Sequence, residues 1–260
     1  MGSIPLLFLL IVSLFTSDVD AEEINVAVAS NFTAPMKSIA AAFENRTGHK
    51  VKLSFGASGK FYAQIRYGAP FQVFFSADQA KPKQLEDDNL IVPGSRFTYA
   101  VGALALWSAQ PNFINNDAST LKSKDVRKIA LANPKLAPYG AAAIEVLTHL
   151  DLHESTKGKW VKGENIAQTY QFISTHNAEL GFVSLSQILR EGKLLNGSVW
   201  IIPTALYSPI KQDAVLLQKG KDSEAAQNLL NFMRSEDAIK IIASFGYAPS
   251  THALTTKAAQ

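Results

Sequence analysis

The 260-residue chain contains no cysteine, which excludes both a disulfide framework and a lipid anchor attached through cysteine. It also lacks a basic cluster, because its 25 lysines and arginines are scattered among 22 acidic residues. That distribution disfavours a nucleic-acid-binding surface. The apolar run from Ile4 to Phe15 is too short to span a bilayer. A hydrophobic fraction of 47% with 18% charged residues instead indicates a folded globular chain.

The N-terminus has the features of an export signal. Small and polar residues follow the apolar run, and Val19-Asp20-Ala21 is an acceptable cleavage pattern. Cleavage after Ala21 removes two acidic residues and no basic one, leaving 25 basic against 20 acidic residues and a net charge of +5. No Lys or Arg precedes the run, so an uncleaved anchor is the alternative. We predict that residues 1–21 are a signal peptide and that the cysteine-free mature chain is periplasmic.

Strand and helix patterns alternate from Ile24 onward. Buried strands are predicted at 24–30, 51–55 and 72–77, and helices at 33–43, 60–67 and 79–87, the last capped by Asp78. This β-α order predicts a parallel sheet covered by helices.

A second unit begins with a long apolar strand, 99–107. It contains further strands at 128–133 and 180–184 and helices at 141–150 and 165–176. A last strand pair at 198–203 and 213–218 then leads to two C-terminal helices at 223–234 and 236–243. No linker or repeat divides the chain, so extended strands are expected to cross between two α/β lobes. We assign residues 22–100 and 206–260 to lobe I and 101–205 to lobe II. Ligands of such folds bind at the carboxyl ends of strands.

The loop Gly56-Ala57-Ser58-Gly59-Lys60 joins a strand to a helix, where several chemistries are possible. A P-loop would need glycine at Ser54 and a hydroxyl at Phe61. A nucleophile elbow would need glycine at Lys60. None of the five histidines lies beside an acid on a predicted strand-end loop, so a serine hydrolase using Ser58 lacks a base and remains only an alternative.

A protein-bound metal is also disfavoured. His149 and His153 have the spacing of one helical turn, but the helix ends there and no third ligand has a suitable offset. We therefore expect no cofactor and no catalytic residue.

Four predicted helix starts carry small, hydroxyl or amide groups. They are Ser30-Asn31, Ser58, Tyr139-Gly140 and Ile166. A helix N-terminus has unpaired N–H groups and about half a positive elementary charge. If the lobes face each other, these starts converge on the cleft, which favours anion binding.

Seven segments then carry a resemblance to a known family. They are "VAVASNFTAPM", "FGASGKFYAQI", "GAPFQVFFSAD", "ANPKLAPYGAAAIEVL", "ENIAQTYQFI", "AELGFVSLSQI" and "YSPIKQDAVLL". In order and spacing the mature chain resembles the periplasmic molybdate-binding proteins of ABC-type uptake systems. The resemblance implies a two-lobed type II binding-protein fold with mostly parallel sheets. It further implies a monomer without enzymatic activity that closes on molybdate or tungstate and docks on an ABC permease.

The resemblance also implies a ligand set. It comprises Ser30, Asn31, Ser58, Tyr139 and Ile166, which contact the metal only through the oxygens of molybdate. Ser184 stands where one branch of the family has a tyrosine hydroxyl, and Tyr139 is expected to replace that hydroxyl.

Such a site, built of neutral donors, favours a fully deprotonated dianion. Protonated phosphate would leave its proton unpaired, at a cost of roughly 1–3 kcal/mol. Sulfate has the charge and shape of molybdate but is smaller, so cavity size must discriminate between them. A sulfate- or phosphate-type receptor therefore remains the alternative within this class.

Overall fold

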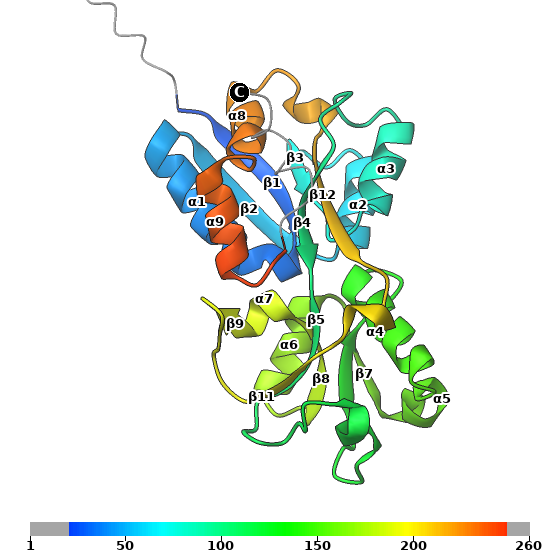
Figure 1. Ribbon diagram of the computed structural model, residues 1–260. Coiled ribbons are helices and arrows are strands. Elements are labelled where there is room, and N and C mark those ends of the chain that lie inside the picture. Colours follow the sequence, from blue (N-terminus) through cyan, green and yellow to red (C-terminus); the bar gives the residue numbers. More distant parts are fainter. Residues whose placement is uncertain (1–20, 249–260) are drawn as a thin grey trace, which may run out of the picture.

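The computed structural model describes residues 21–248, which form two stacked α/β lobes (Figure 1). The strands of lobe I are β1 (Glu23–Ala29), β2 (Lys50–Gly56), β3 (Val73–Phe75), β4 (Phe97–Gly102) and β12 (Ile210–Leu216). Those of lobe II are β5 (Leu104–Ser108), β6 (Ile129–Ala132), β7 (Trp160–Gly163), β8 (Leu180–Ser184) and β11 (Ser198–Ile201). The sheet orders are β2-β1-β3-β12-β4 and β11-β5-β8-β6-β7.

The predicted two-lobed α/β fold is confirmed, with sheets that are mixed rather than mostly parallel. Each sheet has two parallel and two antiparallel pairings. Every antiparallel pairing involves a strand that enters or leaves a lobe. The return of the chain between lobes therefore accounts for the departure from a parallel sheet.

Helices cover both faces of each sheet (Figure 1). In lobe I they are α1 (Thr33–Thr47), α2 (Ser58–Arg66), α3 (Ala80–Asp87), α8 (Glu224–Phe232) and α9 (Glu236–Ser244). In lobe II they are α4 (Pro138–His149), α5 (His153–Thr156), α6 (Ile166–Ser174) and α7 (Leu185–Ile188), with a small hairpin of β9 (Leu189–Arg190) and β10 (Lys193–Leu194). Short 3₁₀ turns are η1 (Ser30–Phe32), η2 (Ala118–Lys122), η3 (Lys157–Lys159), η4 (Thr204–Leu206) and η5 (Gln218–Gly220).

Alternate residues of the buried strands face opposite sides of each sheet. In β1, Val26 and Val28 pack with α1, α8 and α9, whereas Ala27 between them packs with α2 and α3. In lobe II, Leu131 packs with α4, and Ala130 packs with α6 and α7. Because helices bury both faces, the strands read as continuous apolar runs rather than alternating ones.

The chain crosses between the lobes on extended segments. The strand predicted at 99–107 is two strands, β4 and β5, which divide at Ala103 and run end to end from lobe I to lobe II (Figure 1). The return crossing leads from β11 to β12. These two were predicted as a pair, which is wrong: β11 pairs with β5 in lobe II, and β12 lies between β3 and β4 in lobe I.

The predicted cap of α3 is present in a slightly shifted form. The helix begins at Ala80, and the Asp78 carboxylate accepts the backbone N–H of Lys81 at 3.0 Å.

The predicted leader lies outside the described residues, apart from Ala21. Within residues 21–248, no helix is both long enough and apolar enough to cross a membrane.

Candidate functional site

The carboxyl ends of three parallel strands lie level with one another in lobe I. The end of β1 is in register with the ends of β2 and β3. Ser30, Ser58 and Ala77, which follow these strands, therefore lie at the same edge of the sheet. The Ser58 hydroxyl accepts the backbone N–H of Ala77 at 2.9 Å. That bond uses one of the two lone pairs of the hydroxyl oxygen and leaves the hydroxyl proton able to donate.

The same arrangement occurs in lobe II. Strand β6 is parallel to both β7 and β8. Helix α4 with Tyr139 follows β6, α6 begins with Ile166 after β7, and Ser184 ends β8. Gly140 allows α4 to pack close to its strand, since a Cβ there would lie 2.1 Å from the carbonyl oxygen of Ala132.

Contacts between the lobes bring these two edges together. The Gly59 N–H donates to the carbonyl oxygen of Leu136 at 3.0 Å. Ala29 and Ala77 of lobe I belong to a hydrophobic cluster that also contains Ile166 of lobe II. The six predicted site residues all lie at these edges, and each is at most 5% exposed: Ser30, Asn31, Ser58, Tyr139, Ile166 and Ser184.

Local sequence explains which N–H groups these helix starts present. Helix α2 begins at Ser58, two residues before the predicted start, after Ala57, which has no side chain that can cap. In α4 the first helical residue, Pro138, has no N–H, so the first amide donor of this helix belongs to Tyr139.

Helix α6 is capped in a way that spares its first amide. The Asn165 side chain accepts the backbone N–H groups of the second and third helical residues, Ala167 and Gln168. The N–H of Ile166, at the first position, is outside this cap and outside the helical ladder.

The site carries no formal charge. Lys60, the basic residue nearest Ser58 in sequence, forms an ion pair across the lobes with Glu164, and both side chains are about half exposed. Burial raises the pKa of the Tyr139 and Tyr247 hydroxyls above the ordinary tyrosine value, which keeps them neutral. Among residues 21–248, no group of three or more His, Cys, Asp or Glu side chains could hold a metal.

Comparison with known proteins agrees with this geometry. A model for bacterial extracellular solute-binding proteins matches residues 24–248. The chain belongs to this family. It is 55% identical to the molybdate-binding protein ModA of Azotobacter vinelandii over 227 residues, covering 87% of this chain and 90% of that protein. It is 50% identical to ModA of Rhodobacter capsulatus over 228 residues, covering 87% and 88%.

A solved structure of a relative agrees in fold with this solute-binding protein. The A. vinelandii periplasmic molybdate-binding protein superposes with a TM-score of 0.85 at 39% identity, covering 88% of this chain and all of that chain. The resemblance predicted from the sequence is confirmed.

Two hydroxyls of this solute-binding protein have partners within the protein. The Tyr139 hydroxyl accepts a hydrogen bond from Gln212 Nε2 at 3.2 Å, beside Gly102 at the end of β4, where the chain crosses between the lobes. The Ser184 hydroxyl lies 2.8 Å from that of Ser186. The expectation that Tyr139 replaces a ligand hydroxyl at Ser184 stays a prediction.

Three buried polar residues behind the site were not predicted from the sequence: Ser186, Gln212 and Tyr247. The Asn31 side-chain amide donates to Gln212 Oε1 at 2.8 Å and to the Tyr247 hydroxyl at 2.9 Å. The Asn31 carbonyl oxygen accepts the Ser186 hydroxyl at 2.8 Å. Gln212 lies between Lys211 and Asp213, just before the strand predicted at 213–218, and Tyr247 follows the last helix, so neither residue had a local signal of burial.

Proposed function

We propose that this protein captures molybdate, and tungstate as well, and delivers the oxyanion to the permease of an ABC transporter. One observation carries the proposal: helix starts from both lobes meet in a buried, uncharged region of a chain 55% identical to a molybdate-binding protein. Uncharged N–H and O–H donors suit a dianion that has no proton of its own to place.

The proposed ligand set follows from the positions of the helix starts. Ser58 binds through its hydroxyl and its N–H, and Tyr139 and Ile166 bind through their backbone N–H groups. Ser30 and Asn31 bind from the end of β1, and Ser184, which stands where one branch of the family has a tyrosine hydroxyl, is an additional candidate. Because the Asn31 side-chain amide already donates twice within the protein, its backbone N–H is the better candidate donor.

Location and organisation belong to the same proposal. The chain acts outside the cytoplasm as a periplasmic monomer after removal of residues 1–21. Its lobe I comprises residues 22–100 and 206–260, and lobe II comprises residues 101–205. The membership of the two sheets supports this division, apart from β4, which continues in lobe I to Gly102.

A binding role is favoured over serine hydrolysis. The Ser58 hydroxyl is hydrogen-bonded to the backbone N–H of Ala77, and a hydrolase would need a histidine or carboxylate at that oxygen. Loss of acyl-ester hydrolysis in a Ser58→Ala variant would be needed to restore the enzymatic alternative.

Isothermal titration of the mature chain tests the proposal. Molybdate and tungstate should bind with sub-micromolar affinity, whereas sulfate and phosphate should bind far more weakly. Equal binding of sulfate would contradict the proposed selectivity. Absence of binding by all four oxyanions would contradict the proposed function.

A further inference from the structure

Gln212 lies between the two halves of the proposed anion site. It belongs to β12, a strand beside the return crossing, and it is fully buried. Its Oε1 accepts the side-chain amide of Asn31 at 2.8 Å and the Tyr99 hydroxyl at 3.0 Å. Its Nε2 donates to the Tyr139 hydroxyl at 3.2 Å. One amide thus links a proposed anion-binding residue of lobe I to one of lobe II.

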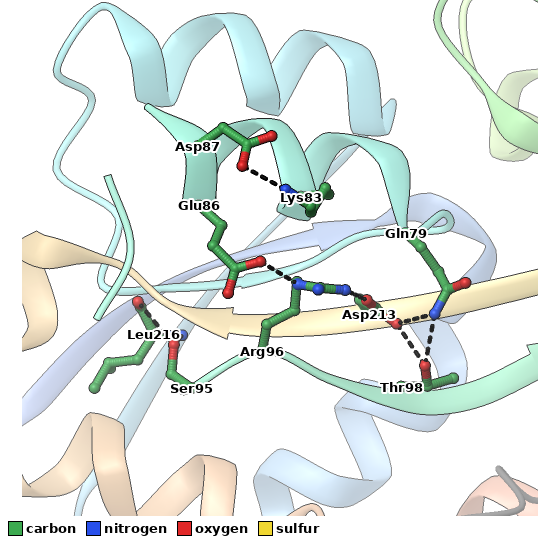
Figure 2. Close-up of polar contacts among 9 residues, drawn as sticks. All are labelled: Gln79, Lys83, Glu86, Asp87, Ser95, Arg96, Thr98, Asp213 and Leu216. Atoms are coloured by element: carbon green, nitrogen blue, oxygen red, sulfur yellow. Dashed lines mark hydrogen bonds and ion pairs between the residues drawn. The ribbon is translucent and has the colours of Figure 1, made fainter. Parts of the chain in front are cut away.

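The neighbouring residue anchors the strand on lobe I. The pairing of β12 with β4 shifts register between Gln212 and Asp213. The buried Asp213 carboxylate accepts hydrogen bonds from the Arg96 guanidinium at 2.9 Å, the Thr98 hydroxyl at 2.7 Å and the Gln79 side-chain amide at 3.1 Å (Figure 2). Glu86 accepts the Nε of the same Arg96. A carboxylate with three side-chain donors fixes the backbone immediately beside Gln212.

The space around the amide is closely fitted. A Cβ on Gly102, the last residue of β4, would lie 2.6 Å from Gln212 Nε2 and 2.0 Å from the Tyr139 hydroxyl oxygen. The hydrogen bond between Gln212 and Tyr139 therefore lies where β4, the strand that leads out of lobe I, has a glycine and so no side chain. The two ends of an amide differ, one accepting and one donating, so the three hydrogen bonds require a single orientation of Gln212.

We propose that Gln212 is a positioning residue that couples the two halves of the anion site. It acts through Asn31 and Tyr139, holding them in the relative positions in which both face one oxyanion. This inference rests on the proposed function. Because the amide is neutral, it links the lobes without adding a negative charge near a dianion.

Replacement by leucine tests this role. Gln212→Leu should weaken molybdate binding in isothermal titration by about tenfold or more, since it removes hydrogen bonds to Asn31 and Tyr139. Gln72→Leu is the matched control, because the Gln72 side chain accepts the backbone N–H of Asn25 and has no hydrogen bond to Asn31, Tyr139 or Asp213, and its binding should stay within about twofold of wild type. Binding by the Gln212→Leu variant within twofold of wild type would overturn the inference.

A double-mutant cycle separates positioning from a general loss of stability. If Gln212 acts through Tyr139, the leucine change should cost a smaller fold-change in a Tyr139→Phe background than in wild type. An equal cost in both backgrounds would contradict that route.

The nearly isosteric Gln212→Glu variant decides the case if the leucine variant does not fold. It keeps an acceptor toward Asn31 but adds a negative charge, so molybdate binding should fall by at least tenfold, with a smaller loss at high salt. Unchanged binding would refute the inference. A wild-type chain that binds no oxyanion would instead contradict the proposed function itself.

Discussion

The backbone N–H of Gly59 in lobe I donates to the carbonyl oxygen of Leu136 in lobe II at 3.0 Å. A Cβ at Gly59 would lie 3.1 Å from both the Cα and the carbonyl oxygen of Leu136, closer than an ordinary van der Waals contact. The second glycine of the loop is therefore explained by the approach of the lobes, immediately beside Ser58.

Gly59→Ala should weaken molybdate binding by roughly 1–3 kcal/mol, because the added methyl group pushes against the Leu136 backbone when the lobes are closed. Isothermal titration measures the effect. Gly158→Ala is the control, since a Cβ at Gly158 would have no atom within 4 Å. Equal affinity of the Gly59 variant and wild type would show that the lobes can separate slightly here without loss.

Ser58→Ala should affect both binding and stability. Loss of a hydroxyl donor to a charged ligand should cost roughly 1.5–3 kcal/mol of binding free energy. The buried N–H of Ala77 also loses its acceptor, so the free energy of unfolding without ligand should fall by roughly 1–3 kcal/mol.

Titration calorimetry and denaturant unfolding separate the two effects of Ser58→Ala. Ser38→Ala, at an exposed position on α1, should change neither quantity appreciably. A Ser58 variant that loses stability but binds molybdate normally would assign the hydroxyl to the fold alone.

The sequence predicted the parts of the molecule that follow from local pattern. Apolar runs predicted most of the strands, and a helix start after a predicted strand singled out Ser58, because the carboxyl ends of parallel strands share an edge. Ile166 was singled out as a helix start alone, since β7 before it, Trp160–Gly163, was not predicted as a strand. It did not predict Gln212 or Tyr247. Their partners lie 181 and 216 residues away from them in the chain, so only the tertiary fold brings these side chains to Asn31.

The pairing of β11 with β12 was mispredicted for a related reason. Two consecutive strands separated by a short segment usually pair in one sheet. Here the intervening segment, Ile202 to Pro209, carries the chain from one lobe to the other. Nothing in the local pattern distinguishes such a crossing from a hairpin connection.

The ion pair between Lys60 and Glu164 spans the lobes but should contribute little. Their side chains are 47% and 45% exposed, so water screens the attraction. Lys60→Met should weaken molybdate binding by less than about 1 kcal/mol, and high salt should abolish the difference. A loss above 2 kcal/mol that persists at high salt would mean that Lys60 acts on the anion directly.

Three buried tyrosine hydroxyls behind the site make stability sensitive to alkaline pH. Burial raises the pKa of Tyr99, Tyr139 and Tyr247 above the ordinary value of 10.0. In the unfolded chain these phenols ionise near pH 10, whereas in the folded chain they stay protonated. The unfolded state then binds fewer protons, so their contribution to stability is fully present below about pH 10 and is lost as the pH rises further.

The free energy of unfolding, measured by denaturant titration, should therefore fall above about pH 10, by about 1.4 kcal/mol per pH unit for each such tyrosine. Tyr247→Phe should make this fall shallower. Tyr67→Phe is the control, because Tyr67 is 93% exposed and is not one of these buried hydroxyls. The Tyr247 hydroxyl is hydrogen-bonded to both Asn31 and Ser186. If both variants gave the wild-type slope, the loss of stability at alkaline pH would come from groups other than this hydroxyl, which would contradict the prediction.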